Sequence, residues 1–405
     1  MTERLDHIAG LGATALQLGP VFESTAHGYD TADYFTVDRR LGDDATLRHL
    51  SAEVHRRGMR LVLDGVLNHV GRDFWAFRDV RERGPASPYA GWFHLDFAGR
   101  SPYDDDFAYE GWAGHHDLVK LDVDNPQVRE HLFAAVAQWI ERYDVAGLRL
   151  DAADVLSADF VRALAAHARR LRDDIWLVGE MVSGDYTRLA GPGLLDGCTN
   201  YELYKSLWSA HADRNYFELA FALNRQYGPD GIYRGLRHGS FADNHDVDRV
   251  GSSVGDPAHL YPLYGLLLTV PGTPSVYYGS EWGVRGRRSA DSDRQLRPAF
   301  AELVPEQPAL ADAIRRLARL RAEQPALRHG SYRQLHVAHE QLAFARTTAD
   351  QEVVVAVNAA TDWARVPLGE AGRGPFRDLM TGEVVAADGE GLPVPPMWLR
   401  AVRAA

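Results

Sequence analysis

Short apolar runs alternate with amphipathic helical patterns through the first 324 residues of the chain. The apolar runs lie at 13–21, 59–66, 145–150, 175–180, 197–202, 239–244 and 273–279. Apolar residues with helical spacing recur between them, near 45–57, 126–142, 159–171, 215–225, 256–268 and 308–323. This alternation predicts parallel βαβ units. Because the runs are apolar on both faces, we expect strands that are covered on both sides.

Three stretches depart from the alternation. Leu5, Ile8 and Leu11 have helical spacing before Gly12, so the chain begins inside a helix with no strand ahead of it. Residues 71–124 lose all periodicity and are too many for a plain loop, which predicts an inserted subdomain. Residues 325–405 contain short β patterns such as YRQLHVA, LAFARTT and EVVVAVNAA, and predict a C-terminal antiparallel β domain.

The predicted fold class is α/β, a (β/α)8 TIM barrel built from residues 1–70 and 125–324, of which seven strands are visible. An open, doubly wound sheet is the alternative, and it usually brings a glycine-rich phosphate loop. The sequence contains neither G-x-G-x-x-G nor G-x-x-x-x-G-K-[ST].

Composition narrows the class of partner. The net charge is −12, from 44 basic and 56 acidic residues, which gives no electrostatic reason to bind nucleic acid or an anionic membrane. A transmembrane helix and a secretory signal are not expected, because neither apolar pattern occurs. A single cysteine, Cys198, fits a reducing compartment. We therefore expect a cytoplasmic protein, and the oligomeric state stays open.

Polar residues end several of the predicted strands. Asp64, Asn68 and His69 follow one strand, Arg149 and Asp151 the next, Glu180 a third, and Asn244, His245 and Asp246 a later one. In a parallel barrel these positions face a shared pocket. A single acid there could simply cap the following helix. Three acids on distinct strands, Asp151, Glu180 and Asp246, favour a carboxylate cluster, in which like charges push pKa values apart, as glycoside cleavage requires.

The chain resembles the α-amylase family of glycoside hydrolases. The resemblance lies in DGVLNHV (64–70), GLRLDAADV (147–155), GEMV (179–182) and FADNHD (241–246), in family order. The segments HGYDTADY (27–34) and PGTPSVYYGSEWG (271–283) also fit family patterns, and LVKLD (118–122) resembles a segment of cyclomaltodextrinases and neopullulanases. The family barrel has eight strands, so the resemblance implies that the first strand would lie upstream of Leu5.

The resemblance implies roles for particular residues. Asp151 matches the nucleophile, Glu180 the general acid/base and Asp246 the third carboxylate. The substrate-binding positions are matched by Arg149, which would hold Asp151 ionised, and by Tyr29, His69, His245, His27, Asp30 and Asp64. The implied reaction is a retaining cleavage of an α-glucan, maltooligosaccharide or cyclodextrin through a covalent glucosyl–enzyme.

Other functions stay open at this point. A transglycosylase or glucoside isomerase would use the same residues, whereas a non-catalytic amylase-like module would be expected to lose the acids. A metal-dependent barrel hydrolase is disfavoured because no H-x-H pair ends a strand. No cofactor is expected. Calcium is conceivable, since Asn68 matches a family ligand, but Val155 stands where the resemblance expects a histidine ligand.

Overall fold

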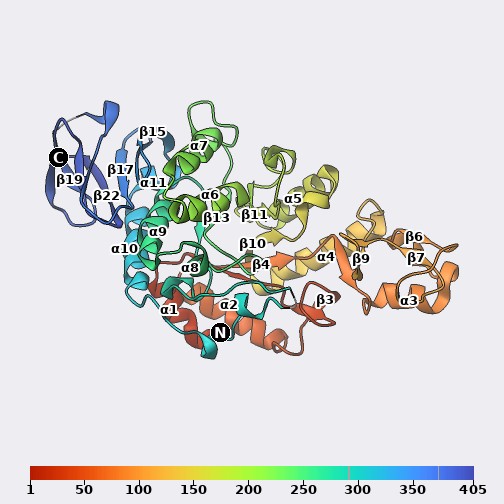
Figure 1. The fold of residues 1–405 in the computed structure, drawn as a ribbon. Coiled ribbons are helices and arrows are strands. Elements are labelled where there is room, and N and C mark those ends of the chain that lie inside the picture. Colours follow the sequence, from red (N-terminus) through yellow and green to blue (C-terminus); the bar gives the residue numbers. More distant parts are fainter. Residues whose placement is uncertain (291, 373) are drawn as a thin grey trace. The chain divides into compact units, whose positions relative to one another are not determined.

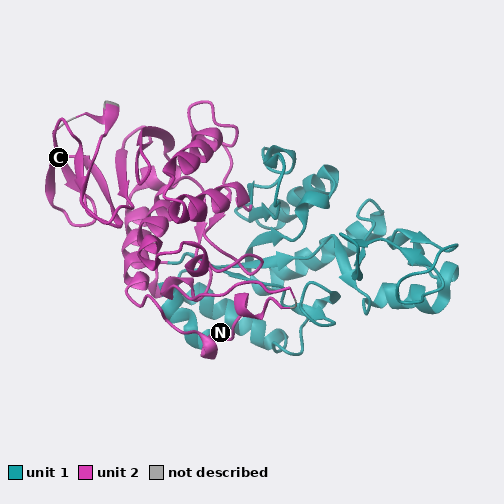
Figure 2. Cartoon of the chain, in the orientation of Figure 1, with its two compact units in different colours: residues 1–9, 13–198 teal, residues 10–12, 199–405 magenta. Residues whose placement is uncertain are grey.

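The structure is a computed structural model that describes residues 1–290, 292–372 and 374–405. The chain forms two compact units (Figures 1 and 2). Unit 1 comprises residues 1–9 and 13–198, and unit 2 comprises residues 10–12 and 199–405. Within the described residues, no helix combines the length and apolar character needed to cross a bilayer.

A five-stranded parallel sheet forms the centre of unit 1. Its strand order is β1-β4-β10-β11-β12, with β1 at Ala15–Leu18, β4 at Arg60–Gly65, β10 at Val145–Leu150, β11 at Trp176–Gly179 and β12 at Gly197–Cys198. Every residue of β10 is buried, which confirms the expectation of a strand covered on both faces. The register places Arg149 of β10 beside Asp64 of β4.

Capped helices connect these strands. They are α2 (Asp44–Arg56), α4 (Pro126–Tyr143) and α5 (Ala158–Leu171), and a further helix, α1 (Leu5–Gly10), precedes β1. Asp43, Asn125 and Ser157 each accept a backbone N–H of the first turn of the helix that follows. Each cap satisfies one otherwise unpaired donor and so fixes where the helix begins.

The predicted insert contains short elements around aromatic side chains. It holds α3 (Trp75–Arg83) and the pair β6 (Leu95–Asp96) and β7 (Ala108–Tyr109). Its strands β9 (His115–Lys120) and β8 (Gly111–Trp112) form a three-stranded sheet with β5 (His69–Gly71), which begins just before the predicted insert. Phe77 packs edge-to-face on Phe93 at 5.2 Å and on Tyr109 at 5.0 Å between ring centroids. A separate hairpin, β2 (Phe22–Ser24) with β3 (Thr31–Val37), follows β1.

Unit 2 continues the strand–helix alternation. The parallel pair β13 (Gly239–Phe241) and β14 (Thr273–Ser275) corresponds to the last two predicted strands. The helices of this unit are α6 (Tyr201–Ala212), α7 (Tyr216–Tyr227), α8 (Val250–Ser253), α9 (Leu260–Thr269), α10 (Leu310–Glu323) and α11 (Pro325–His329).

The C-terminal region of unit 2 is an antiparallel β structure, as predicted. A six-stranded sheet has the order β15-β16-β17-β22-β19-β20, and β18 pairs with β21. The strands are β15 (Ser331–Val337), β16 (Gln341–Thr347), β17 (Glu352–Asn358), β18 (Ala364–Val366), β19 (Gly374–Asp378), β20 (Val384–Ala387), β21 (Leu392–Val394) and β22 (Trp398–Ala404). Val354, Phe376 and Val402 are buried in its core.

One predicted strand is wrong in its extent. The range 197–202 was expected to be extended throughout, but β12 ends at Cys198 and α6 begins at Tyr201. The reason is Asn200, whose side-chain oxygen accepts the backbone N–H of Leu203 at 3.0 Å and starts the helix. Helix α6 was not predicted.

Candidate active site

Arg149 contacts three carboxylates at the ends of neighbouring strands in unit 1. Its Nη1 donates to Asp151 Oδ1 at 2.9 Å and to Asp64 Oδ2 at 3.1 Å. Its Nη2 lies 2.6 Å from Glu180 Oε1. The planar guanidinium presents five N–H donors in a fixed arrangement, which lets one side chain hold several carboxylates at once.

The strand register brings these groups together. Arg149 and Asp151 are two residues apart, so they lie on the same face of the extended chain. Asp64 sits beside Arg149 on β4, and Glu180 follows β11 directly, with its N–H donating to Leu150 O at 2.8 Å. Because the strands are parallel, their carboxyl ends meet at one edge. The predicted cluster comprised Asp151, Glu180 and Asp246; in unit 1 the structure brings Asp151 and Glu180 together with Asp64 around Arg149, and Asp246 belongs to unit 2.

The backbone beside Asp151 also holds Glu180. Ala152 has a left-handed conformation, with φ of +46°, and its N–H donates to Glu180 Oε2 at 3.1 Å. Glu180 therefore has one oxygen on a guanidinium and the other on a backbone amide. Both contacts are to fixed groups, which restricts the orientation of the carboxylate.

Burial dominates the electrostatics of the cluster. Asp151 is 8% exposed, and burial raises its pKa to about 7, against the lowering effect of Arg149 and with a further rise from Glu180 and Asp64. Arg149 itself keeps its charge, since Asp64 and Glu180 outweigh the effect of burial and its pKa is raised. Arg149 thus acts in the predicted direction, since it lowers the pKa of Asp151, while burial, Glu180 and Asp64 raise it.

His69 is a buried neighbour of Asp151. Its Nε2 is 3.8 Å from Asp151 Oδ2, and its Nδ1 is 3.2 Å from Asn68 Nδ2. Burial lowers the pKa of His69 to about 4, so the ring is neutral near pH 7 and can donate or accept a hydrogen bond without a change of charge.

Tyr29 reaches the cluster from the loop between β2 and β3. Its hydroxyl donates to Asp64 Oδ2 at 3.0 Å. The loop is held by Asp30, whose carboxylate accepts the backbone N–H groups of Ala26, His27 and Gly28 at 2.8, 3.0 and 3.2 Å. The ring of His27 accepts the N–H of Tyr29 at 3.3 Å. In this structure Asp30 and His27 shape the loop that presents Tyr29.

Asp246 and His245 belong to unit 2 and follow β13. His245 Nε2 is 3.1 Å from Asp246 Oδ2, and Arg297 Nη2 is 3.3 Å from Asp246 Oδ1. Asn244 accepts the N–H of Asp246 at 2.8 Å. The side chain of Asp246 is 32% exposed, so the carboxylate is available to a ligand.

Three contacts of these residues were not anticipated. Gln17 Nε2 donates to Asp64 Oδ1 at 3.3 Å, and the signal for it was a polar residue inside an apolar strand. Arg297 pairs with Asp246 from 51 residues away, a distance at which sequence spacing carries no information. Trp112, in the insert, lies 5.6 Å from the ring of His69 between centroids.

The residues present do not fit the calcium site that the resemblance raised. Asn68 is buried and its amide contacts His69, and the position of the second family ligand is the apolar Val155. Across the described ranges, no group of three His, Cys, Asp or Glu side chains is arranged to hold a metal ion. We therefore assign no step of the chemistry to calcium.

A parallel sheet that brings two carboxylates together at its strand ends fits a glycoside-cleaving enzyme. Residues 1–324 match the family described as "Alpha amylase, catalytic domain". The chain belongs to this family.

Individual relatives agree with this assignment. Neopullulanase 2 of Thermoactinomyces vulgaris is 35% identical over 95% of this chain and 66% of its own length. The cyclomaltodextrinase of Geobacillus thermopakistaniensis (strain MAS1) is 31% identical over 96% of this chain and 67% of its own length. This chain thus spans about two thirds of the length of these relatives.

A solved structure covers nearly the whole chain. The cyclic α-maltosyl-(1→6)-maltose hydrolase of Arthrobacter globiformis, in complex with its cyclic substrate, has a TM-score of 0.84 and 30% identity. The match covers 99% of this chain and 88% of that one.

Proposed function

We propose that this protein is a retaining glycoside hydrolase of α-glucans, with Asp151 as nucleophile and Glu180 as general acid/base. The observation that carries the proposal is the pairing of both carboxylates with the same guanidinium, that of Arg149. A shared cation at the ends of adjacent strands holds the two acids close together, where they can flank one glycosidic bond, as a two-carboxylate cleavage requires.

In the proposed reaction, Asp151 attacks the anomeric carbon while Glu180 gives its proton to the departing glycosidic oxygen. The bond from the anomeric carbon to that oxygen breaks, and a covalent glucosyl–Asp151 ester forms. Glu180 then takes a proton from water, whose oxygen attacks the same carbon and releases Asp151. Arg149 and the Ala152 amide hold the two acids, and His69 and Tyr29 would bind the hydroxyl groups of the cleaved ring.

Three further elements belong to the same proposal. The parallel strands β1, β4, β10, β11, β12, β13 and β14 would be members of one (β/α)8 barrel, with residues 71–124 as its insert and 325–405 as the β domain. Asp246 and His245 would then complete the site as the third carboxylate and a substrate-binding histidine. Cytoplasmic location is proposed on the single cysteine, Cys198, which is buried.

Oligosaccharides of α-linked glucose are the proposed substrates. The names of the relatives refer to pullulan, cyclomaltodextrin and a cyclic maltosyl-maltose. Transglycosylation is the second candidate, since a sugar hydroxyl could replace water in the second step on the same residues. The presence of all three family acids disfavours a non-catalytic module.

A product screen tests the proposal. The protein is incubated with maltotriose, cyclodextrins, pullulan, isomaltose, trehalose and sucrose, with and without an added acceptor sugar. We expect hydrolysis of at least one α-glucan by the unaltered protein and loss of turnover in Asp151→Asn. Turnover should be unchanged in Asp159→Asn, which removes an exposed carboxylate from α5. Turnover in Asp151→Asn above a few per cent of the original rate would refute the assignment of the nucleophile.

A further inference from the structure

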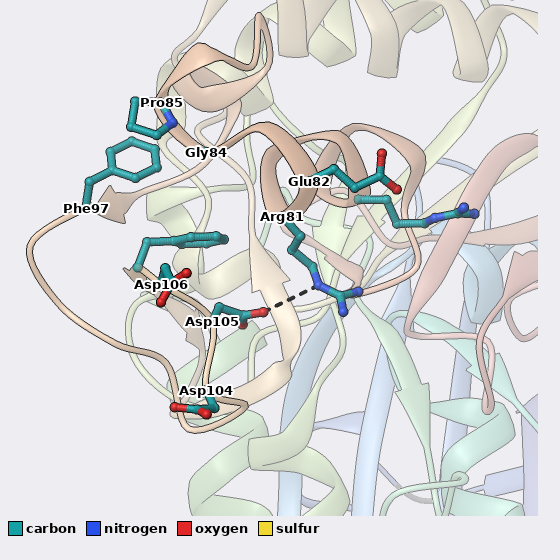
Figure 3. Close-up of a pocket in the computed structure, with 10 residues that line it drawn as sticks. Arg81, Glu82, Gly84, Pro85, Phe97, Asp104, Asp105 and Asp106 are labelled. Carbon is teal, nitrogen blue, oxygen red and sulfur yellow. Dashed lines mark ion pairs between the residues drawn. The ribbon is translucent and has the colours of Figure 1, made fainter.

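A cavity of about 720 Å³ opens in the insert of unit 1, among residues that the proposed reaction does not use. This volume is within the range of small-molecule sites, roughly 300–1,000 Å³. One wall comes from the end of α3 and the turn after it, and the other from the loops around β6 and β7 (Figure 3).

The lining combines apolar and polar surface. Phe107 is buried beneath the cavity, with its ring 5.7 Å from that of Phe97, which is 39% exposed. Pro85 adds a second exposed apolar surface. Exposed charged side chains, among them Arg78, Arg81 and Glu82, surround these rings. An exposed aromatic ring beside polar groups offers a stacking surface together with hydrogen-bonding partners.

The three aspartates in the lining already have cationic partners. Asp105 is held by Arg72 at 2.8 Å and lies 3.4 Å from Arg81. Asp104 and Asp106 pair with Arg100 at 2.5 and 3.1 Å. A paired carboxylate still has lone pairs for further donors. Such groups can accept hydroxyl protons without losing their partners, whereas a charged ligand would have to displace them.

The charges and geometry exclude two other ligand classes. An anion would face four carboxylates against two arginines in the lining. A multivalent cation would need a preformed set of ligands, and no such set of three exists in the part of the chain that the structure describes. A neutral ligand with apolar ring faces and many hydroxyl groups can stack on the aromatic surface and donate hydrogen bonds to the paired carboxylates.

We propose that this cavity is a second carbohydrate-binding site, which takes glucose units of an α-glucan away from the cleavage position and stacks one ring on Phe97. The proposal rests on the proposed function for its choice of sugar. In this proposal the exposed Phe97 binds one part of the glucan, and the Arg149 cluster acts on another part of the same glucan molecule.

The test uses the full chain with Asp151→Asn as background, so that sugars are bound and not cleaved. Calorimetric titration with maltoheptaose is expected to show two classes of site. Adding Phe97→Ala should weaken one class at least about fivefold, while Phe221→Ala, which removes a 70% exposed phenylalanine of α7, should change neither.

Hydrolysis assays separate this proposal from the assignment of function. With Asp151 intact, Phe97→Ala should leave the kcat/KM for maltotriose unchanged and lower the rate on a long glucan. An unchanged second class of site in Phe97→Ala, or a single class in both proteins, would overturn the second site even if hydrolysis is normal. Absence of turnover with two classes of site intact would instead count against the proposed reaction.

Discussion

Arg149 Nη1 lies 2.9 Å from Asp151 Oδ1, which follows two residues later, just after the end of β10, and both residues are buried. Asp64 and Glu180 share the same guanidinium. The cluster therefore places three carboxylates against one guanidinium in a buried position, so its protonation should affect stability and, in the proposed reaction, catalysis.

The charge of Arg149 cannot be supplied equally well by lysine. In Arg149→Lys a compact ammonium replaces the planar guanidinium group, which contacts three carboxylates. We expect kcat/KM to fall at least about 100-fold, because the two acids lose their fixed positions. The pKa of Asp151 should rise further, so the acid limb of the pH–rate profile should move to higher pH. An unchanged limb would contradict the role given to Arg149.

Asp151 should weaken the fold at neutral and alkaline pH. Its pKa is raised from 3.8 to about 7 in the folded protein, so the folded state binds this proton more tightly than the unfolded state. The stabilisation is complete below about pH 4 and is lost as the pH rises through 7. Asp151→Asn removes this titration, and we expect its Tm to exceed that of the unaltered protein at pH 8.

Thermal unfolding across pH 4–8 measures this difference. The gain in Tm of Asp151→Asn should shrink as the pH falls, and Asp159→Asn, at an exposed position, should show no such trend. A variant that is less stable than the unaltered protein at pH 8 would contradict the electrostatic account of the cluster.

His69 is expected to bind substrate in its neutral form. Its pKa is lowered to about 4 by burial, so it does not titrate between pH 5 and 8. His69→Gln should therefore raise KM and lower kcat/KM about 10- to 100-fold by loss of substrate hydrogen bonds, while the acid limb of the pH profile stays in place. A shift of that limb in His69→Gln would mean that the histidine, and not a carboxylate, titrates there.

Asp30 should act through Tyr29. Its carboxylate accepts three backbone N–H groups of the loop that carries this tyrosine. Asp30→Ala leaves those donors without their acceptor, so we expect a several-fold rise in KM with a smaller change in kcat. Asp30→Asn keeps one oxygen and should restore part of the loss. Equal effects of the two substitutions would point to a general loss of folding.

The sequence predicted the strands better than their ends. The run VAGLRL coincides with β10 because both of its faces are apolar and Asp144, in left-handed conformation, ends the preceding helix. The predicted strand at 197–202 was too long because the strand ends and a helix begins within this short range. Asn200 caps that helix, but its neighbours in the sequence fit a strand pattern equally well.

The site was predictable where contacts follow strand register. Asp64, Arg149 and Asp151 lie at neighbouring strand ends, so a parallel fold brings them together. The net pKa of Asp151 was not predictable, since it depends on how deeply the group is buried as well as on its partners. The contact of Arg297 with Asp246 depends on a loop whose path no periodic pattern encodes.

The anomeric form of the first product tests the central claim most directly. Proton NMR of the sugar released from maltotriose in the first minutes, before mutarotation, records whether configuration is kept at the cleaved carbon. Two displacements at Asp151 and then at water predict the α-anomer. Initial release of the β-anomer would mean a single displacement and would contradict a covalent intermediate on Asp151.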